Sequence, residues 1–575
     1  MVRSGLRILI AALLFGVLFS GVYLSVGINS DFGKLEVRAV SVKDSGKQLS
    51  GLLYRPTSAT PEKPTPAVVI AHGISESKDM MSNIGLELAK RGLVVLCLDL
   101  IGHGQSDGTV EEGSVETDFG VSAAVHFLQS QAYVNASAIG LVGHSLGAGA
   151  VRAAAEQDKA ILAVVLVGGG LESSAQGPEY GTLNATFPRN LLVIVGEYDV
   201  LFNATDLQNR ELLLAFNCPA PIVPGVTYGS FDLGVARELL IPATTHLFEM
   251  VDPGNVAQVV GWMQKSLKPI EASLAQSNLS LSYTEREVAL LFALIGLLGI
   301  SLISYYPLAR LLSMKSGGER FLKSSRKSKS KFYFVWFFLN LVLFFPMVLI
   351  GFAISFPPLI FGSSIAWWVL ATGSFGIFLF AENKPKFFKT KPNLKKILLE
   401  SFYKKGIAIA LGAFAILLGV SSIIQALFFV NLRILAPIFQ EFTQMRRVLA
   451  FAAFVPFFLV YFFAEGLYLH GPQNAVLGHE NIGAKIAEWA KVVSVKVSPF
   501  LFIIALQYLP KLIFNTWLLP SFLGFIAEFV WLITPIFVVS TTCSFWFDKK
   551  TGAIGTGTVF NVLMLSWIAA IVFPF

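Results

Sequence analysis

The chain has 575 residues, which is too many for one domain. Hydrophobic residues make up 54% of it and charged residues only 14%, an average too apolar for a soluble protein and typical of a chain with membrane spans. The net charge of +7 does not indicate nucleic-acid binding, because the basic residues lie in short loops between apolar stretches. The three cysteines, Cys97, Cys218 and Cys543, form neither a disulfide framework nor a metal cluster, although a Cys97–Cys218 bridge stays open.

The first apolar run predicts an N-terminal membrane anchor. Arg3 and Arg7 precede a stretch from Ile8 to about Gly27 that is long enough to cross a bilayer. A cleaved signal peptide is the alternative, but no good small-x-small cleavage site precedes Asn29. We therefore expect residues 1–28 to be an uncleaved anchor, with its basic end in the cytoplasm and the following residues translocated.

Residues 29–285 differ in kind from the rest of the chain. Short apolar runs alternate with helical patterns here, which predicts a mostly parallel sheet covered by helices on both faces. Four Asn-x-Ser/Thr sequons lie in this region and none beyond it, which agrees with an external and glycosylated face. Strands are expected at 35–42, 49–54, 67–71, 93–98, 138–144, 162–167, 191–195 and 238–242, and the sequons begin at Asn135, Asn184, Asn203 and Asn278.

Residues 286–575 are a succession of apolar runs, which predicts an all-α transmembrane domain. About eight spans are expected, near 288–308, 332–354, 359–381, 406–429, 448–470, 498–517, 521–543 and 554–575. With the anchor, this makes about nine. The basic loops 310–331 and 384–405 are both cytoplasmic if the N-terminus is cytoplasmic and residues 29–285 are outside. The loop 431–447 fits less well, because it carries Arg433, Arg446 and Arg447 but falls outside.

The stretch from Ala138 to Ala150 carries the strongest chemical signal. An apolar strand breaks at Gly143-His144-Ser145-Leu146-Gly147 and continues into a helix, which is the pattern of a nucleophile elbow. The two glycines allow the backbone to crowd at a sharp turn. Ser145 is left at its tip, and the amide of Leu146 lies at a helix N-terminus, where an oxyanion is stabilised.

A serine nucleophile needs a base and an acid that orients the base. The strand 191–195 ends in Gly196-Glu197-Tyr198-Asp199, and the strand 238–242 runs into His246. Asp199 is therefore the expected acid, with Glu197 as a nearby competitor, and His246 is the expected base. Three such residues, each following a strand and in the order Ser, acid, His, favour a catalytic triad over unrelated turn residues.

The oxyanion site needs a second amide, and the loop after the strand 67–71 can supply it. In this loop Gly73 allows close approach and Ile74 presents its N–H. His72 is expected to hold the loop rather than to act as a base. Asp99 and His103, in a glycine-rich turn after another strand, are expected to brace that turn by hydrogen bonds.

These motifs together resemble the α/β-hydrolase superfamily. The residues are His72-Gly73, Asp99-x-x-Gly102-His103-Gly104-x-Ser106, the Gly143–Gly147 elbow, Asp199 and His246. The nearest groups are the serine aminopeptidases and monoacylglycerol-lipase-like enzymes, with dienelactone hydrolases further off. The resemblance covers about residues 35–268 and implies an eight-stranded sheet and hydrolysis of an ester, amide or thioester through an acyl-enzyme.

The sequence departs from these families in two places. Little room is left for a lid between 167 and 191, whereas a long excursion separates Asp199 from His246. Residues 228–234 of that excursion look like a hairpin that could shape the substrate pocket. No known family is recognised for residues 288–575.

Two acidic residues fall inside predicted spans, where an ionised group is costly unless it is paired or wetted. Glu465 and Glu528 therefore mark a candidate polar site for substrate, lipid headgroup or proton. The alternative is structural: Glu465 reaches the interface at a span end, and Glu528 makes one interhelical hydrogen bond.

Three hypotheses of function follow. The first is a membrane-integral serine hydrolase with its active site outside the cell membrane, acting on a small-molecule ester, a lipid or a peptide, with no metal, cofactor or nucleic acid. The second is a transporter or sensor in which the hydrolase-like domain binds ligand or is inactive. The third is a hydrolase or acyltransferase acting on a lipid-linked substrate that the membrane domain presents.

Overall fold

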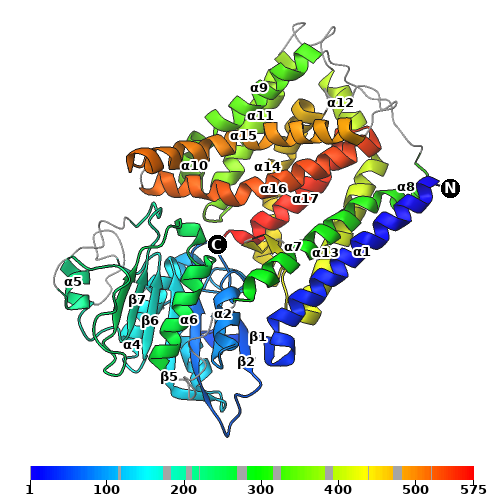
Figure 1. Cartoon of the computed structure of the whole chain (residues 1–575). Helices are drawn as coiled ribbons and strands as arrows, with labels where there is room; N and C mark the ends of the chain where they lie inside the picture. Colours follow the sequence, from blue (N-terminus) through cyan, green and yellow to red (C-terminus); the bar gives the residue numbers. More distant parts are fainter. Residues whose placement is uncertain are drawn as a thin grey trace.

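The chain folds into an α/β domain that lies against one end of a helical bundle (Figure 1). The N-terminus lies at the end of the bundle away from the α/β domain, and the C-terminus lies beside that domain. The computed structural model describes residues 2–113, 118–171, 183–202, 210–218, 221–267, 281–314, 326–382, 393–434, 436–437, 439–470, 482–519 and 521–575.

The α/β domain is built on one sheet that contains all of the predicted strands. Its 8 strands follow the order β1-β2-β4-β3-β5-β6-β7-β8. β2 is antiparallel to both neighbours, and the strands from β4 to β8 are parallel. The strands are β1 (Leu35–Asp44), β2 (Lys47–Pro56), β3 (Thr65–Ala71), β4 (Val94–Leu98), β5 (Val134–His144), β6 (Ala163–Val167), β7 (Leu191–Ile194) and β8 (Arg237–Leu240).

Helices cover both faces of this sheet, because its central strands are apolar on both sides. Along β3, Val68 and Ile70 belong to one buried cluster and Val69 to another, as the alternation of side chains in a strand requires. The first cluster includes α2 (Ser82–Ala89) and α6 (Pro253–Leu267), and the second includes α3 (Val121–Gln129), α4 (Leu146–Gln157) and α5 (Arg210–Phe216).

The remaining helices form the bundle. Eight helices are long and apolar enough to cross a membrane, and a ninth span results if the pair α9 and α10, bent by 44°, counts as one. The predicted count of about nine therefore agrees with the described residues. The helices are α1 (Val2–Asn29), α7 (Tyr283–Ile303), α8 (Tyr305–Leu311), α9 (Arg326–Val342), α10 (Phe344–Ile354), α11 (Gly362–Glu382), the short α12 (Leu394–Ser401), α13 (Lys404–Phe428), α14 (Met445–Glu465), α15 (Ile482–Phe514), α16 (Ser521–Thr551) and α17 (Ile554–Val572).

Helix α1, the expected N-terminal anchor, is packed tightly onto α7. A Cβ added to Gly21 would lie 2.5 Å from the backbone nitrogen of Ala293, and one added to Gly296 would lie 2.7 Å from that of Leu18. Glycines let two helices approach closely where neither lipid nor water drives them together. The glycines at the contact, Gly21 and Gly296, therefore allow α1 to pack closely on α7.

The arginines of the loop 431–447, which fitted the charge pattern poorly, bind the α/β domain. Arg446 donates to the carbonyls of Ser106 and Gly108. Arg433 binds Glu287 of α7 and reaches the Ser82 hydroxyl at 3.3 Å. These cations therefore have a structural reason to lie on the side of the bundle that carries the α/β domain.

Arg447 joins three separate parts of the chain. Its guanidinium donates to the carbonyls of Ala570 (2.8 Å) and Phe573 (2.6 Å) at the end of α17 and to Gly104 (3.2 Å) in the α/β domain. The side chain is 2% exposed. The last residue, Phe575, continues this contact through backbone hydrogen bonds with Gly102 and Val110.

The predicted hairpin at 228–234 lies away from the expected pocket. Tyr228 pairs with Arg237 as an isolated antiparallel bridge. The Gly234 carbonyl accepts from the backbone N–H of Asn190 at the amino end of β7, and Phe231 packs on Trp262 with ring centroids 4.6 Å apart. Because Asp199 follows the carboxyl end of β7, the turn is at the opposite edge of the sheet and does not shape the site.

Of the predicted sequons, Asn135 and Asn184 are exposed, whereas Asn203 and Asn278 lie outside the described residues. All three cysteines are free, which excludes the Cys97–Cys218 bridge in this structure. The parts of the two basic loops that are described meet, since Lys405 Nζ donates to the Ser313 carbonyl at 3.2 Å. The two loops therefore lie on the same side of the bundle, as the charge pattern predicted.

Arg447→Leu tests the junction between the bundle and the α/β domain. Each buried carbonyl left without a donor costs about 1–3 kcal/mol, so we expect the melting temperature of the full chain in detergent to fall. Arg310→Leu, a matched change at an exposed arginine of α8, should leave the melting temperature nearly unchanged. Equal melting temperatures for the two variants would contradict this role of Arg447.

Candidate active site

The elbow between β5 and α4 holds Ser145 in an unusual backbone conformation, with φ 52° and ψ −116°. Two glycines make this turn sterically feasible. A Cβ on Gly143 would lie 2.2 Å from the carbonyl oxygen of Gly147, and a Cβ on Gly147 would lie 2.4 Å from that of Ala71. The strained turn therefore lifts the Ser145 side chain out of the sheet at the start of α4.

Ser145, His246 and Asp199 lie in one hydrogen-bonded line. His246 Nε2 is 3.0 Å from Ser145 Oγ, and His246 Nδ1 is 2.8 Å from Asp199 Oδ2. The other oxygen of Asp199 accepts the backbone N–H groups of Leu201 and Phe202 at 2.7 and 3.0 Å, which fixes the carboxylate. The sequence-predicted residues are thus brought together from the ends of three strands.

Glu197, the competing acid, is exposed and is not the carboxylate on His246. The turn after β7 exposes Glu197 and buries Asp199. Asp199 is 2% exposed and His246 is 1% exposed, so the hydrogen bond between them is shielded from water. A shielded charge-assisted hydrogen bond is stronger than an exposed one.

The loop after β3 and the start of α4 carry the two expected oxyanion amides, those of Ile74 and Leu146. The loop after β3 lies directly on the elbow, since a Cβ on Gly73 would lie 3.0 Å from the Ser145 Cβ. Leu146 is the first residue of α4, so its N–H has no intrahelical acceptor. Among the described residues, neither Ile74 nor Leu146 donates its backbone N–H to a protein acceptor. Both amides are free for a substrate oxygen.

The predicted bracing residues lie behind this loop. His72 Nε2 accepts the backbone N–H of Leu100 at 3.1 Å, and Asp99 accepts those of Lys78 and Gln105 at 2.7 and 2.9 Å. His103 Nδ1 lies 3.0 Å from the Ile101 carbonyl. These contacts agree with the structural roles expected for His72, Asp99 and His103.

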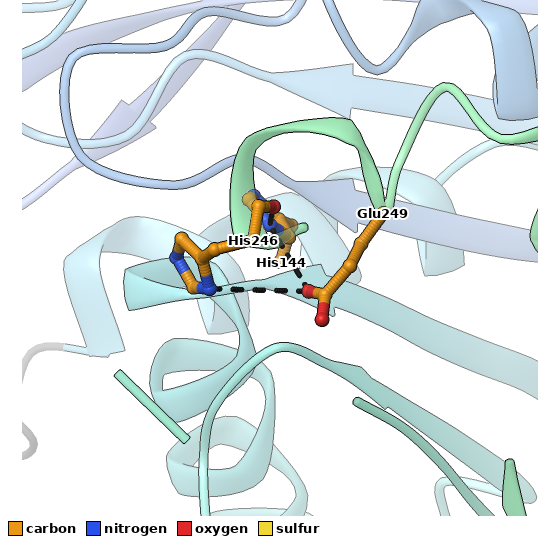
Figure 2. Close-up of side chains that lie close together, drawn as sticks. All are labelled: His144, His246 and Glu249. Carbon is orange, nitrogen blue, oxygen red and sulfur yellow. Dashed lines mark hydrogen bonds and ion pairs between the residues drawn. The ribbon is translucent and has the colours of Figure 1, made fainter. Parts of the chain in front are cut away.

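A group of buried titratable side chains behind the elbow was missed in the sequence. His144 Nδ1 lies 3.0 Å from Glu76 Oε1, and His144 Nε2 lies 3.6 Å from Glu249 Oε2. Figure 2 shows that Glu249 also lies beside His246, whose Nδ1 is 3.9 Å from the same oxygen. The sequence alone gives no reason to single out Glu76 or Glu249, because neither lies within a motif. Of the three, only His144 lies within a motif, the elbow.

The pKa values in this group follow from burial and pairing. Burial alone would lower the pKa of His144, but the Glu76 and Glu249 carboxylates raise it to about 10. Burial raises the pKa of Glu249 to about 7, against the lowering effect of the His144 hydrogen bond. For His246, burial lowers the pKa and Asp199 raises it by more, so its pKa lies above the ordinary value. His144 is therefore a cation at neutral pH.

His144, His246 and Glu249 also lie close enough to hold a metal ion, with ligand atoms within 4.8 Å of one another. The hydrogen bonds show that two of these nitrogen atoms already face protein oxygen atoms. His246 Nδ1 faces Asp199 at 2.8 Å, and His144 Nε2 faces the His246 carbonyl at 3.1 Å. A nitrogen that donates a proton to an oxygen has no lone pair for a metal. The donor set fits a hydrogen-bonded network better than a metal centre.

Comparison with known proteins agrees with this geometry. Residues 66–207 match the alpha/beta hydrolase fold family. The α/β domain has the α/β-hydrolase fold. The family match and the eight-stranded sheet confirm the fold class and the superfamily expected from the sequence motifs.

Several solved structures resemble the hydrolase domain. The esterase Pf2001 of Pyrococcus furiosus has 17% sequence identity and a TM-score of 0.31, and the match covers 41% of this chain and 96% of that chain. Est1E of Butyrivibrio proteoclasticus, solved with ferulic acid bound, has 16% identity and a TM-score of 0.29, with coverage of 40% and 97%. A hypothetical protein of Pseudomonas aeruginosa has 18% identity and a TM-score of 0.32, with coverage of 41% and 94%. No curated protein matches the chain in sequence.

The bundle supplies part of the wall around the hydrolase site. The Phe525 ring of α16 meets the His246 ring edge to face, with centroids 5.5 Å apart. A Cβ on Gly524 would lie 2.3 Å from the Val200 side chain, so α16 approaches the loop that carries Asp199 very closely. The hydrolase site is therefore covered by a candidate membrane span.

The two predicted intramembrane acids have different surroundings. Glu528 follows Phe525 by one turn of α16, and the Tyr508 hydroxyl donates to it at 2.9 Å. Glu465 lies at the other end of α14 from the hydrolase domain, where it pairs with Lys496. Lys496 was missed in the sequence because the span was predicted to begin at 498, whereas α15 begins at Ile482. The structure does not join Glu465 and Glu528 in one site.

His144→Gln tests the buried ion pair by its dependence on pH. A histidine whose pKa is about 10 when folded and about 6.5 when unfolded adds stability below pH 6.5 and loses it as the pH rises toward 10. We expect the melting temperature of the variant to lie below wild type at pH 6.5, by an amount that shrinks toward pH 10. His126→Gln, at an exposed histidine of α3, should show no such trend. A constant deficit of His144→Gln at all pH values would argue against a charged pair.

Proposed function

We propose that the protein is a membrane-integral serine hydrolase that cleaves a carboxylic ester, or an amide or thioester, through an acyl-enzyme. Ser145 is the nucleophile, His246 the general base and Asp199 the acid that orients the imidazole. The observation that carries this proposal is the line of hydrogen bonds from Asp199 through His246 to Ser145, with distances of 2.8 and 3.0 Å. The hydrolase fold of the domain supports the same reaction class.

The proposed reaction has two halves. Ser145 Oγ attacks the substrate carbonyl carbon while His246 Nε2 takes the hydroxyl proton, and the free amides of Ile74 and Leu146 stabilise the oxyanion. The bond from carbon to the leaving group then breaks, and His246 returns the proton to that group. A water molecule, activated by His246, hydrolyses the acyl-enzyme and restores Ser145.

His144 and Glu249 have supporting roles in this proposal. Both side chains lie beside His246, and neither contacts the Ser145 hydroxyl in the described residues. The His144 ring lies 5.0 Å from the His246 ring, and His144 Nε2 faces the His246 backbone carbonyl at 3.1 Å. A charged and buried neighbour of this kind fixes the position of His246 before substrate binds.

The hydrolase domain is proposed to lie outside the cell membrane. The argument is the positive-inside rule, applied to the N-terminal Arg3 and Arg7 and to the two basic loops, which share one side of the bundle. The hydrolase domain lies against the other end of the bundle (Figure 1). The substrate is then an external or outer-leaflet ester, lipid or peptide.

Ser145→Ala should abolish labelling of the protein by a fluorophosphonate, because the probe needs an activated serine hydroxyl. The measurement is in-gel fluorescence of the full chain in membranes, followed by identification of the labelled peptide. Applied to intact cells, a membrane-impermeant version of the probe should label the wild type, since the site is proposed to face outward.

Ser41→Ala is the matched control for this experiment, because Ser41 is an exposed serine of β1. It should be labelled like the wild type. Labelling of Ser145→Ala at wild-type rate would refute the nucleophile, and labelling only after cell lysis would refute the orientation.

Asp199→Asn tests the base through the pH profile of ester hydrolysis. His246 must be neutral to accept a proton, and its pKa is raised by Asp199, so the acid limb of kcat/KM should lie above pH 6.5 in the wild type. The variant should lose roughly 10³- to 10⁴-fold in kcat, and its acid limb should move to lower pH. Glu197→Gln, at the exposed neighbour, should change neither. An unshifted limb in Asp199→Asn would assign the titration to another group.

A further inference from the structure

A row of phenylalanine rings leads from His246 into the bundle. The Phe525 ring lies 5.5 Å from the His246 ring. It lies 6.0 Å from Phe361 of the loop before α11 and 4.9 Å from Phe529 on α16. Phe525 itself is 4% exposed, so it separates the hydrolase site from whatever lies behind it.

An apolar cavity begins behind Phe525. Its volume is about 100 Å³, and Phe361 and Phe529 are among its lining residues. Its walls come from α10, α11, α14, α16 and α17, and Ser364 is the one lining residue with a hydroxyl, amide or charged side chain. Apolar cavities of about this size hold small apolar groups, and the lining offers almost no polar recognition.

The cavity runs along α16 from Ile526 to Phe537. These residues span about 17 Å of helix rise, which is roughly half of a hydrocarbon core about 30 Å thick. The cavity therefore follows α16 from behind Phe525 over a length comparable with one leaflet. Trp368 and Phe537 line the end away from Phe525, with ring centroids 6.1 Å apart.

The chemistry of the lining identifies one class of occupant. A polar ligand would lose its hydrogen bonds to water in such a cavity without replacing them. A hydrocarbon chain loses none, and its narrow cross-section suits a small space that follows about three turns of α16. The end of the cavity at Phe525 adjoins the imidazole that faces Ser145, so the chain would present its carboxyl end to the elbow.

We propose that this cavity holds the acyl chain of a long-chain ester whose carbonyl lies at Ser145. The substrate is then an acyl lipid of the adjoining leaflet, which enters with its chain among the spans. This inference rests on the serine hydrolase proposed above and adds the substrate class and its binding site.

Filling the cavity should change selectivity for chain length. Ile533→Trp and Ile365→Trp add bulk to the lining on two different helices, α16 and α11. In the full chain in nanodiscs, the ratio of kcat/KM for p-nitrophenyl palmitate over p-nitrophenyl butyrate should fall at least about tenfold in each variant. Ile423→Trp, the same substitution at a residue of α13 that is 59% exposed, should leave the ratio within about twofold.

Fluorophosphonate labelling of each variant reports whether the site is intact. If a tryptophan variant is not labelled, the smaller change Ala569→Leu on α17, which also lines the cavity, replaces it in the same assay. An unchanged ratio in variants that are labelled would overturn the proposal. Loss of hydrolysis of hexadecyl butyrate instead of the palmitate ester would assign the cavity to the alcohol chain and overturn the acyl assignment.

The result separates this inference from the proposed function. Wild-type protein that is not labelled at Ser145 and hydrolyses neither ester refutes the serine hydrolase itself. Wild-type protein that is labelled and hydrolyses butyrate, but whose palmitate preference does not respond to the filled cavity, refutes only the acyl-chain site.

Discussion

The architecture of the site depends on the crowding at the Ser145 elbow. The backbone there is held at a positive φ because β5, the start of α4 and the end of β3 meet without any side chain between them. Gly143 and Gly147 are the positions where a methyl group would collide with backbone oxygen atoms. This close contact lifts the serine, leaves the Leu146 amide free and brings the loop with Gly73 alongside.

The second constraint is the union of the hydrolase domain with the bundle. Arginines at the start of α14 bind carbonyls of the glycine-rich turn after β4 and of the chain end after α17. α16 meets the opposite side of the site through Phe525. Because Phe525 is buried against His246, the bundle is part of the wall of the site.

The sequence motifs predicted the α/β domain well because a parallel sheet repeats one local pattern. Each buried strand is an apolar run, and the chemistry follows at its carboxyl end, so Ser145, Asp199 and His246 were found from their places in the chain. Glu76, Glu249, Lys496 and Phe525 were not found, since none stands in a motif and each takes its role from a partner distant in sequence. The turn at 228–234 was misplaced for a related reason: its local pattern gives a turn but not the edge of the sheet on which the turn packs.

The sequence by itself determined which segments are strands, which are long apolar helices, and which three side chains follow strands in the order of a serine hydrolase. These are local properties, because hydrophobic periodicity and turn chemistry act over a few residues. Only the tertiary structure decided that Asp199 rather than Glu197 meets His246, that the arginines of the loop 431–447 bind both parts of the chain, and that an apolar cavity lies behind the Phe525 ring that packs on His246. These three features depend on burial and on contacts between segments that are distant in sequence. Local sequence patterns predict neither.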